Sequence, residues 1–209
     1  MKAFYFAPPG NRLQYGDNRL IRVGITHTVQ GPLKLCHNGL HGSERIIDAL
    51  KYAETTLLYR TDHGGDILRG DDKLCSIDRG YLKRFELNKI LPHFARRQAL
   101  LNIDLIKGCQ DFDLIVDFLE TGDSTLAASA ASAARAATWA ARAESVESAA
   151  WEASAAWGAM AAASAASAAS GAWAASAARA ASGARADQET MLIDMIKTEY
   201  GGDCLEAEE

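Results

Sequence analysis

Hydrophobic and polar positions alternate along the first third of the chain, and helical spacing replaces this alternation further on. The alternation predicts strands over Lys2–Ala7, Arg19–Val29 and Gly31–Cys36. The pair Gly64-Gly65 and the triplet Gly70–Asp72 each stand between extended segments. We therefore expect a tight hairpin turn at each of them. The first part of the chain is therefore predicted to hold an antiparallel sheet.

One helix is expected to lie across this sheet. In "ERIIDALKYA" the residues Ile46, Ile47 and Leu50 recur at helical spacing, and Ser43 stands where a side chain can cap the first turn. Sheet and helix together predict a small α+β domain over residues 1–79.

Helical spacing then dominates, and residues 80–123 predict connecting helices packed on both neighbouring parts of the chain. We expect a break or kink at Pro92 and a short amphipathic helix over Asp111–Leu119. Gly122 is expected to end that helix, with Asp123 or Ser124 as the cap of the next one.

The composition changes abruptly near residue 124. Residues 124–186 are about half Ala, with Ser the next commonest type, and Ala is the best helix former. A single helix of this length would extend roughly 95 Å, and folding back buries more surface. We therefore predict an Ala/Ser-rich antiparallel helical bundle over residues 124–200, followed by an acidic tail at 201–209. Its anchors, and candidate partner-binding residues, are the four tryptophans: Trp139, Trp151, Trp157 and Trp173.

Charge narrows the range of partners. The chain has a net charge of −5, and its acidic residues gather toward the C-terminus without any basic patch, so no nucleic-acid partner is expected.

The uncharged run at 153–178 is mostly Ala and Ser, which argues against a membrane span. Four scattered cysteines and an N-terminus interrupted by Pro8-Pro9 indicate a cytoplasmic protein with reduced thiols.

Two groups of residues are candidate ligand-binding sites. His41, Ser43 and Tyr52 can share a cleft at a helix N-terminus, a place that favours anions; alternatively, His41 only bonds the local backbone. The triplet Asp71-Asp72-Lys73 can bind a metal or phosphate, or simply form a polar turn.

Four residues of the first part of the chain are of types that bind zinc. The possible zinc ligands are Cys36, His37, His41 and His63. Their spacing fits no structural zinc pattern, so neither a metal nor any other cofactor is expected.

The chain contains no P-loop, dinucleotide fingerprint or nucleophile elbow, which leaves no catalytic residue to assign.

The segments "GLHGSERIIDALKYA", "GGDILRGDDKL" and "FLETGDSTLAA", in this order before an Ala-rich tract, resemble an uncharacterised family of phage and bacterial proteins. Gly42 stands where that family usually has Ala. The Ala-rich half is also similar to helical domains of immunity-type proteins. The resemblance implies a non-enzymatic interaction protein that binds and inhibits a host defence or immunity factor. Its partner would be a bacterial host protein, met in the host cytoplasm by a monomer or small homo-oligomer.

The alternative is a nucleotide-handling protein that uses the pocket around His41. "GLH…ALKYA" also resembles a strand–turn–helix segment of ADP-ribosyltransferases, with His41, Ser43 and Tyr52 at the matching positions but no partner Glu near the expected strand. A binder that sequesters a nucleotide belongs to the same class. A third possibility is a structural virion component that assembles through the Ala-rich helices.

Overall fold

The computed structural model describes residues 1–101, 103–144 and 185–206 of the chain. The chain divides into two compact units, one formed by Met1–Leu87 with Glu189–Glu209 and the other by Asn88–Gln188. The domain boundary predicted at residues 79 and 80 falls inside a strand of the first unit. The C-terminal helix returns to that unit, which is therefore built from two separate stretches of sequence.

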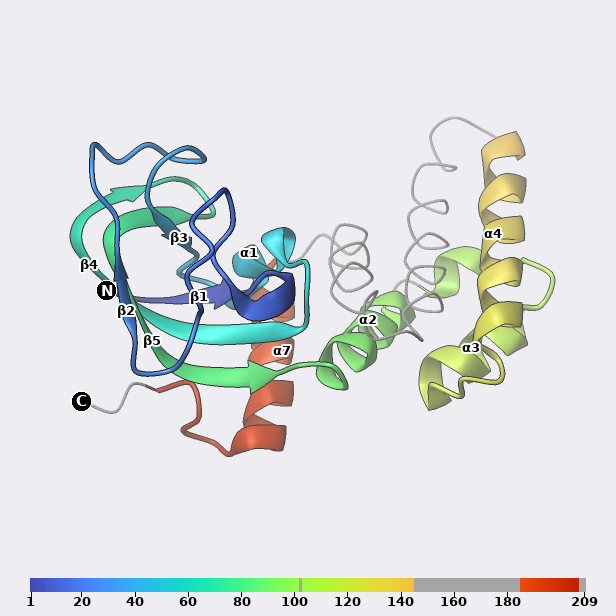
Figure 1. Cartoon of the computed structure of the whole chain (residues 1–209). Coiled ribbons are helices and arrows are strands. Elements are labelled where there is room, and N and C mark those ends of the chain that lie inside the picture. The colour runs from blue at the N-terminus through green and yellow to red at the C-terminus, as the bar shows by residue number, and fades with distance from the viewer. Residues whose placement is uncertain (102, 145–184, 207–209) are drawn as a thin grey trace. The chain divides into compact units, whose positions relative to one another are not determined.

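The first unit is built on a five-stranded antiparallel sheet with the order β1-β4-β5-β2, in which β3 also pairs with β5. Figure 1 shows the two longest strands, β4 and β5, curving together around the unit. The mixed α+β class is thus confirmed. The strands are β1 (Lys2–Phe6), β2 (Thr26–Thr28), β3 (Leu40–Gly42), β4 (Leu57–Arg69) and β5 (Leu74–Glu86).

The hairpin predicted at Gly64-Gly65 is wrong, because β4 continues through both glycines. The register against β5 shifts between Gly64 and Ile67, and Gly65 has a φ of +66°. Glycine in the left-handed region at an irregularity of the ladder is typical of a β-bulge, which bends a strand without ending it. The second turn is confirmed, since Gly70 N–H donates to the Lys73 carbonyl at 2.8 Å where β4 turns into β5.

Two predicted strands are corrected in the same region. Of Arg19–Val29 only the three residues of β2 join the sheet, and Gly31–Cys36 forms a loop ahead of the unpredicted β3. Gly24 and Gly31 have φ angles of +84° and +89°, so the chain turns at both positions and cannot stay extended.

The predicted helix is much shorter than its pattern suggested. It consists of α1 (Ile46–Ala49) and a 3-10 turn, η2 (Leu50–Tyr52), while another 3-10 turn, η1, covers Pro9–Asn11. Ser43 does not cap it. Instead Ser43 pairs with Phe4, whose N–H donates to the Ser43 carbonyl at 2.8 Å.

The cap comes from the other end of the chain. The Glu189 carboxylate, on α7 (Arg185–Tyr200), accepts the N–H groups of Ile46 and Ile47 at 3.0 and 2.8 Å. Burial raises the pKa of Glu189. These bonds satisfy two donors that the start of a helix leaves without partners inside the helix.

The far end of α7 is attached to β5. The Tyr200 ring meets Phe85 edge-on at 5.3 Å, and its hydroxyl bonds both the N–H and the carbonyl of Glu86. Leu192 and Ile196 of α7 are fully buried. The helix predicted from "DQETMLIDMIKTEY" is therefore confirmed, as a structural part of the α+β unit.

The second unit is helical where it is described, with α2 (Ile90–Leu100), a 3-10 turn η3 (Ile103–Ile106), α3 (Phe112–Thr121) and α4 (Ala127–Glu144). Pro92 causes no break, because it lies in the first turn of α2, where no internal hydrogen bond is lost. Gly122 ends α3 with a φ of +70°, as predicted.

Part of the Ala-rich region lies outside the described residues. Trp139 falls in α4, whereas Trp151, Trp157 and Trp173 belong to the range 145–184, so the antiparallel bundle stays a prediction. Among the helices that are described, none has the length and apolar character that crossing a bilayer requires.

Candidate ligand-binding cleft

A cleft of about 840 Å³ opens in the first unit beside a hydrophobic core cluster. That cluster packs Leu13, Ile21, Leu40, Tyr59 and Tyr81 together with Ala7. The cleft wall is formed by residues 4–6 of β1, by residues 36–43 leading into and through β3, and by the loops at 13–17 and 51–54. The lining is completed by Lys73, which directly precedes β5, by Arg79 within β5, and by Pro8, Val29 and Ala49.

Arg79 is the central residue of this cleft. Its side chain is fully buried, with 2% of the residue exposed. Nε and Nη2 donate to the Tyr81 hydroxyl at 3.1 and 2.8 Å, and Nη1 donates to the His41 carbonyl. The guanidinium carbon lies 3.7 Å from the centre of the Tyr5 ring.

Within the described part of the chain, no carboxylate pairs with Arg79. Its acceptors are a phenol and a carbonyl, both uncharged, and the Tyr5 face adds a cation–π contact. Burying a charge is costly unless an opposite charge or a ligand compensates it. The cleft therefore contains a buried positive charge that the described chain leaves without a negative partner.

Tyr81 connects Arg79 to the core. Its hydroxyl accepts the two Arg79 donors and lies 3.1 Å from Nδ1 of the buried His27. Burial raises the pKa of Tyr81 and lowers that of His27, so both side chains are held in their neutral forms. Arg79 is thus the one charged member of this group.

His41 lines the cleft from β3, but its imidazole is already engaged. Nε2 accepts the backbone N–H of Cys36 at 3.0 Å. Burial lowers the pKa of His41, and the nearby charges of Arg79 and Lys73 lower it further. By accepting this N–H, the neutral ring holds the loop before β3 in place. This agrees with the alternative in which His41 only bonds the local backbone. In this arrangement Nε2 is not free to act as a base.

Three of the other candidate residues, Ser43, Tyr52 and Lys73, also line the cleft. Ser43, 2% exposed, and Tyr52, 48% exposed, both line it. The Lys73 ammonium lies 4.7 Å from the centre of the Tyr52 ring. A hydrogen bond with the Cys36 side chain raises the pKa of Lys73, so its charge is retained at neutral pH.

The acidic pair next to Lys73 does not form a site. Asp72 accepts the Tyr52 hydroxyl and the Lys51 ammonium, each at 2.9 Å. The Lys51 bond keeps the pKa of Asp72 below its usual value. Asp71 is exposed at the β4–β5 turn and is not part of the cleft lining. Residues 71–73 thus form a polar turn, the second alternative given for this triplet. Of the three residues, only Lys73 lines the cleft.

The carboxylates that do line the cleft are occupied by neighbours. Glu54 accepts from the Gln14 side chain at 3.0 Å, and Asp17 forms an ion pair with Arg19 at 2.6 Å. Neither is an ion-pair partner of Lys73 or Arg79. The interior of the cleft therefore carries positive charge that its rim does not neutralise.

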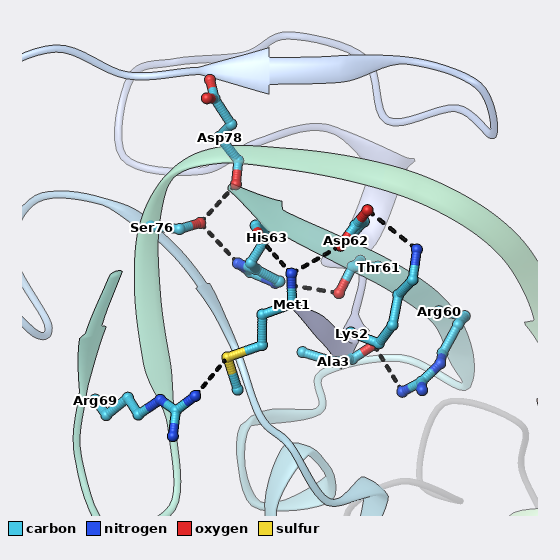
Figure 2. A network of polar contacts seen from close by, with 10 residues as sticks. All are labelled: Met1, Lys2, Ala3, Arg60, Thr61, Asp62, His63, Arg69, Ser76 and Asp78. Atoms are coloured by element: carbon cyan, nitrogen blue, oxygen red, sulfur yellow. Dashed lines mark hydrogen bonds and ion pairs between the residues drawn. The ribbon is translucent and has the colours of Figure 1, made fainter. Parts of the chain in front are cut away.

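β4 and β5 together carry a buried polar network centred on His63 (Figure 2). The Ser76 hydroxyl donates to the Asp78 carbonyl at 2.6 Å, so it accepts from His63 Nδ1 at 2.7 Å. The Thr61 hydroxyl, 3.1 Å from Nε2, is then the donor to that nitrogen. His63 is fully buried and neutral, and burial lowers its pKa to about 3.

Cys36, His37, His41 and His63 do not converge, and the described residues contain no cluster of three or more side chains able to hold a metal. A Cβ added at Gly42 would lie 2.6 Å from Nε2 of His63. Gly42 is therefore required by the buried histidine beside it, and Ala cannot replace it without a shift.

The sequence pattern did not single out Arg79, Tyr5, Tyr15 or Glu54. One signal for Arg79 was available, since it stands two residues before Tyr81 in an alternating segment, and such residues share one face of a strand. No local signal reveals that β1 brings Tyr5 under the guanidinium.

Comparison of this chain with family models, with curated proteins and with solved structures gives no match. The resemblance to a phage and bacterial family thus stays a prediction.

Proposed function

We propose that the α+β unit is a ligand-binding domain whose cleft holds a small phosphorylated molecule. The observation that carries this proposal is Arg79, a buried guanidinium that lines the cleft and has no carboxylate partner in the described chain. An anionic ligand would supply the missing negative charge.

Phosphate fits this arrangement better than a single carboxylate does. Beyond their bonds to His41 and Tyr81, Nη1 and Nη2 of Arg79 each keep one N–H that can donate to a phosphate oxygen, and Lys73 adds a second positive charge to the same cleft. Two cations suit a group that carries close to two negative charges. A cleft of about 840 Å³ also lies within the range of small-molecule sites, roughly 300–1,000 Å³.

Among the functions expected from the sequence, this proposal corresponds to the nucleotide-sequestering alternative, with the ligand held near His41. The engaged Nε2 of His41 favours binding over transferase chemistry. Inhibition of a host defence factor by a phage-type protein stays a prediction, as do a protein partner contacted by the tryptophans and a cytoplasmic location.

Isothermal titration calorimetry on the full chain tests the proposal, with inorganic phosphate, pyrophosphate and AMP as probes. We expect at least one probe to bind. Arg79→Lys keeps a positive charge but loses the guanidinium and is expected to weaken binding about 30-fold or more, the loss typical of a buried charge contact. Lys73→Ala, at the accessible side of the cleft, is expected to weaken binding about tenfold.

Lys83→Ala is the matched control, because Lys83 is an exposed lysine of β5 that does not line the cleft. It should bind the probe as the parent chain does. Circular dichroism establishes that each variant is folded, and Lys73→Ala keeps the test decisive if Arg79→Lys unfolds. Absence of binding by all three probes, or full affinity in folded Lys73→Ala, would refute the proposal.

A further inference from the structure

Tyr15 is held at the mouth of the cleft in an arrangement that the fold itself does not explain. It lines the cleft and is fully exposed, at 102% of the reference area, so its ring packs against nothing in the described chain. A large aromatic ring in water gives up the favourable burial that such side chains normally supply.

The backbone at Tyr15 is unfavourable as well. Tyr15 and Gly16 have φ angles of +60° and +88°, and Asp17 N–H lies 3.4 Å from the Gln14 carbonyl. Two consecutive positive φ angles define a type I′ turn, whose first central position favours Asn, Asp or Gly. Tyrosine is a poor residue for this position, and a strained residue at a cleft suggests a role in function.

The turn itself is firmly placed. Leu13 N–H donates to the Arg19 carbonyl at 2.9 Å, and Asn18 N–H donates to the Leu13 carbonyl at 3.1 Å. Leu13 belongs to the core cluster that lies beside the cleft. The loop therefore presents the Tyr15 ring from a fixed base.

Tyr52 provides a second aromatic surface in the same cleft. It is 48% exposed, and the Lys73 ammonium lies against its ring. The lining thus combines two exposed phenol rings with Lys73 and the buried Arg79, while its third cation, Lys51, is already paired with Asp72. This combination suits a molecule that has a planar ring at one end and an anionic group at the other.

We infer that Tyr15 is a stacking residue for a planar aromatic ring of the bound ligand, which makes the ligand a nucleotide rather than a sugar phosphate or free phosphate. The inference rests on the proposed phosphate-binding function of the same cleft. The phosphate lies toward Arg79 and Lys73, and the base covers the Tyr15 ring. Stacking of a base on an aromatic side chain is sequence-tolerant, so Tyr15 alone selects for a ring and not for one base.

Calorimetry with AMP, UMP and ribose 5-phosphate tests this inference on the full chain. We expect at least one nucleotide to bind about tenfold or more tightly than ribose 5-phosphate, the gain typical of one stacked base. Tyr15→Asn removes the ring and suits the turn, and it should abolish that difference while leaving ribose 5-phosphate binding unchanged. Tyr15→Phe keeps the ring and should preserve the preference.

The outcomes separate this inference from the function on which it rests. Equal affinity for nucleotides and ribose 5-phosphate, or an undiminished preference in Tyr15→Asn, overturns the stacking role while the phosphate site stands. Loss of affinity for all three probes in Tyr15→Asn also overturns it, because the ring would then support the anion site. No binding of any probe by the parent chain overturns both proposals.

Discussion

The buried imidazole of His63 predicts a specific loss of stability in acid. The ring is neutral and enclosed, with the Thr61 hydroxyl aimed at Nε2 and Ser76 accepting from Nδ1. Protonation would place a charge in this enclosure and leave Thr61 without its acceptor. Burial is the main reason that the pKa of His63 falls to about 3, far below the usual value of a histidine, and the positive charges of Arg79 and of the N-terminus lower it further.

The sign and size of the effect follow from proton linkage. The unfolded chain takes up a proton on this residue below about pH 6.5, whereas the folded chain does so only near pH 3. The stability contributed by neutral His63 is therefore complete above pH 6.5 and is lost as the pH falls toward 3. At pH 4.5, two units below 6.5, the loss amounts to about 2–3 kcal/mol, and below pH 3 it approaches about 5 kcal/mol.

Urea unfolding at pH 7.5, 6.0 and 4.5 measures this loss, with His63→Gln as the variant that cannot titrate. The amide of Gln can replace one donor and one acceptor of the ring, so the variant is expected to fold with reduced stability at pH 7.5. Its deficit relative to the parent should shrink by about 2–3 kcal/mol at pH 4.5, because only the parent loses the His63 contribution.

His37→Gln is the control, since His37 is exposed, and its curve should run parallel to that of the parent chain. The reasoning fails if the His63→Gln deficit is independent of pH. A direct check is NMR, in which the His63 imidazole signals should not titrate between pH 8 and 4.5.

Two further predictions concern residues that hold the α+β unit together. Gly42→Ala places a Cβ 2.6 Å from His63 Nε2 and should destabilise the chain by about 1–3 kcal/mol in urea unfolding, whereas Gly202→Ala, in open space, should not. A Gly42→Ala chain as stable as the parent would contradict this contact. Glu189→Ala removes the acceptor of two α1 N–H groups and should lower the free energy of unfolding by about 1–3 kcal/mol. The control Glu199→Ala, at an exposed position of α7, should leave it unchanged. Equal stability of the two variants would refute the capping role of Glu189.

The sequence was informative where structure depends on local pattern. β1, the turn after β4, α3 with its glycine end and the C-terminal helix all follow from periodicity, turn residues and capping. Gly64-Gly65 misled because the same dipeptide serves a hairpin and a bulge, and only the pairing partner decides between them. A similar ambiguity affected Ser43, which pairs with β1 in place of capping α1.

The cleft could be predicted only in part, because its key contacts join distant segments. All three residues of the first candidate group, His41, Ser43 and Tyr52, line one cleft, whereas of the triplet Asp71-Asp72-Lys73 only Lys73 does. These candidates did not reveal that the cleft contains a buried positive charge. That charge belongs to Arg79, whose burial against Tyr5 depends on the order of strands in the sheet. Strand order is a property of long-range pairing, on which the spacing of residues within one strand has no bearing.

The position of Glu189 also bears on the Ala-rich region. Because α7 caps α1 and packs on β5, the α+β unit is closed by a helix that follows the entire second unit in sequence. Closing a longer connection adds little cost even when the connection is fully flexible, about 0.6 kcal/mol for each doubling of its length. The α+β unit thus depends on the docking of α7 far more than on the length of the segment between β5 and α7. An Ala/Ser repeat can consequently expand or contract there while the cleft, with Arg79 and Tyr15, remains intact.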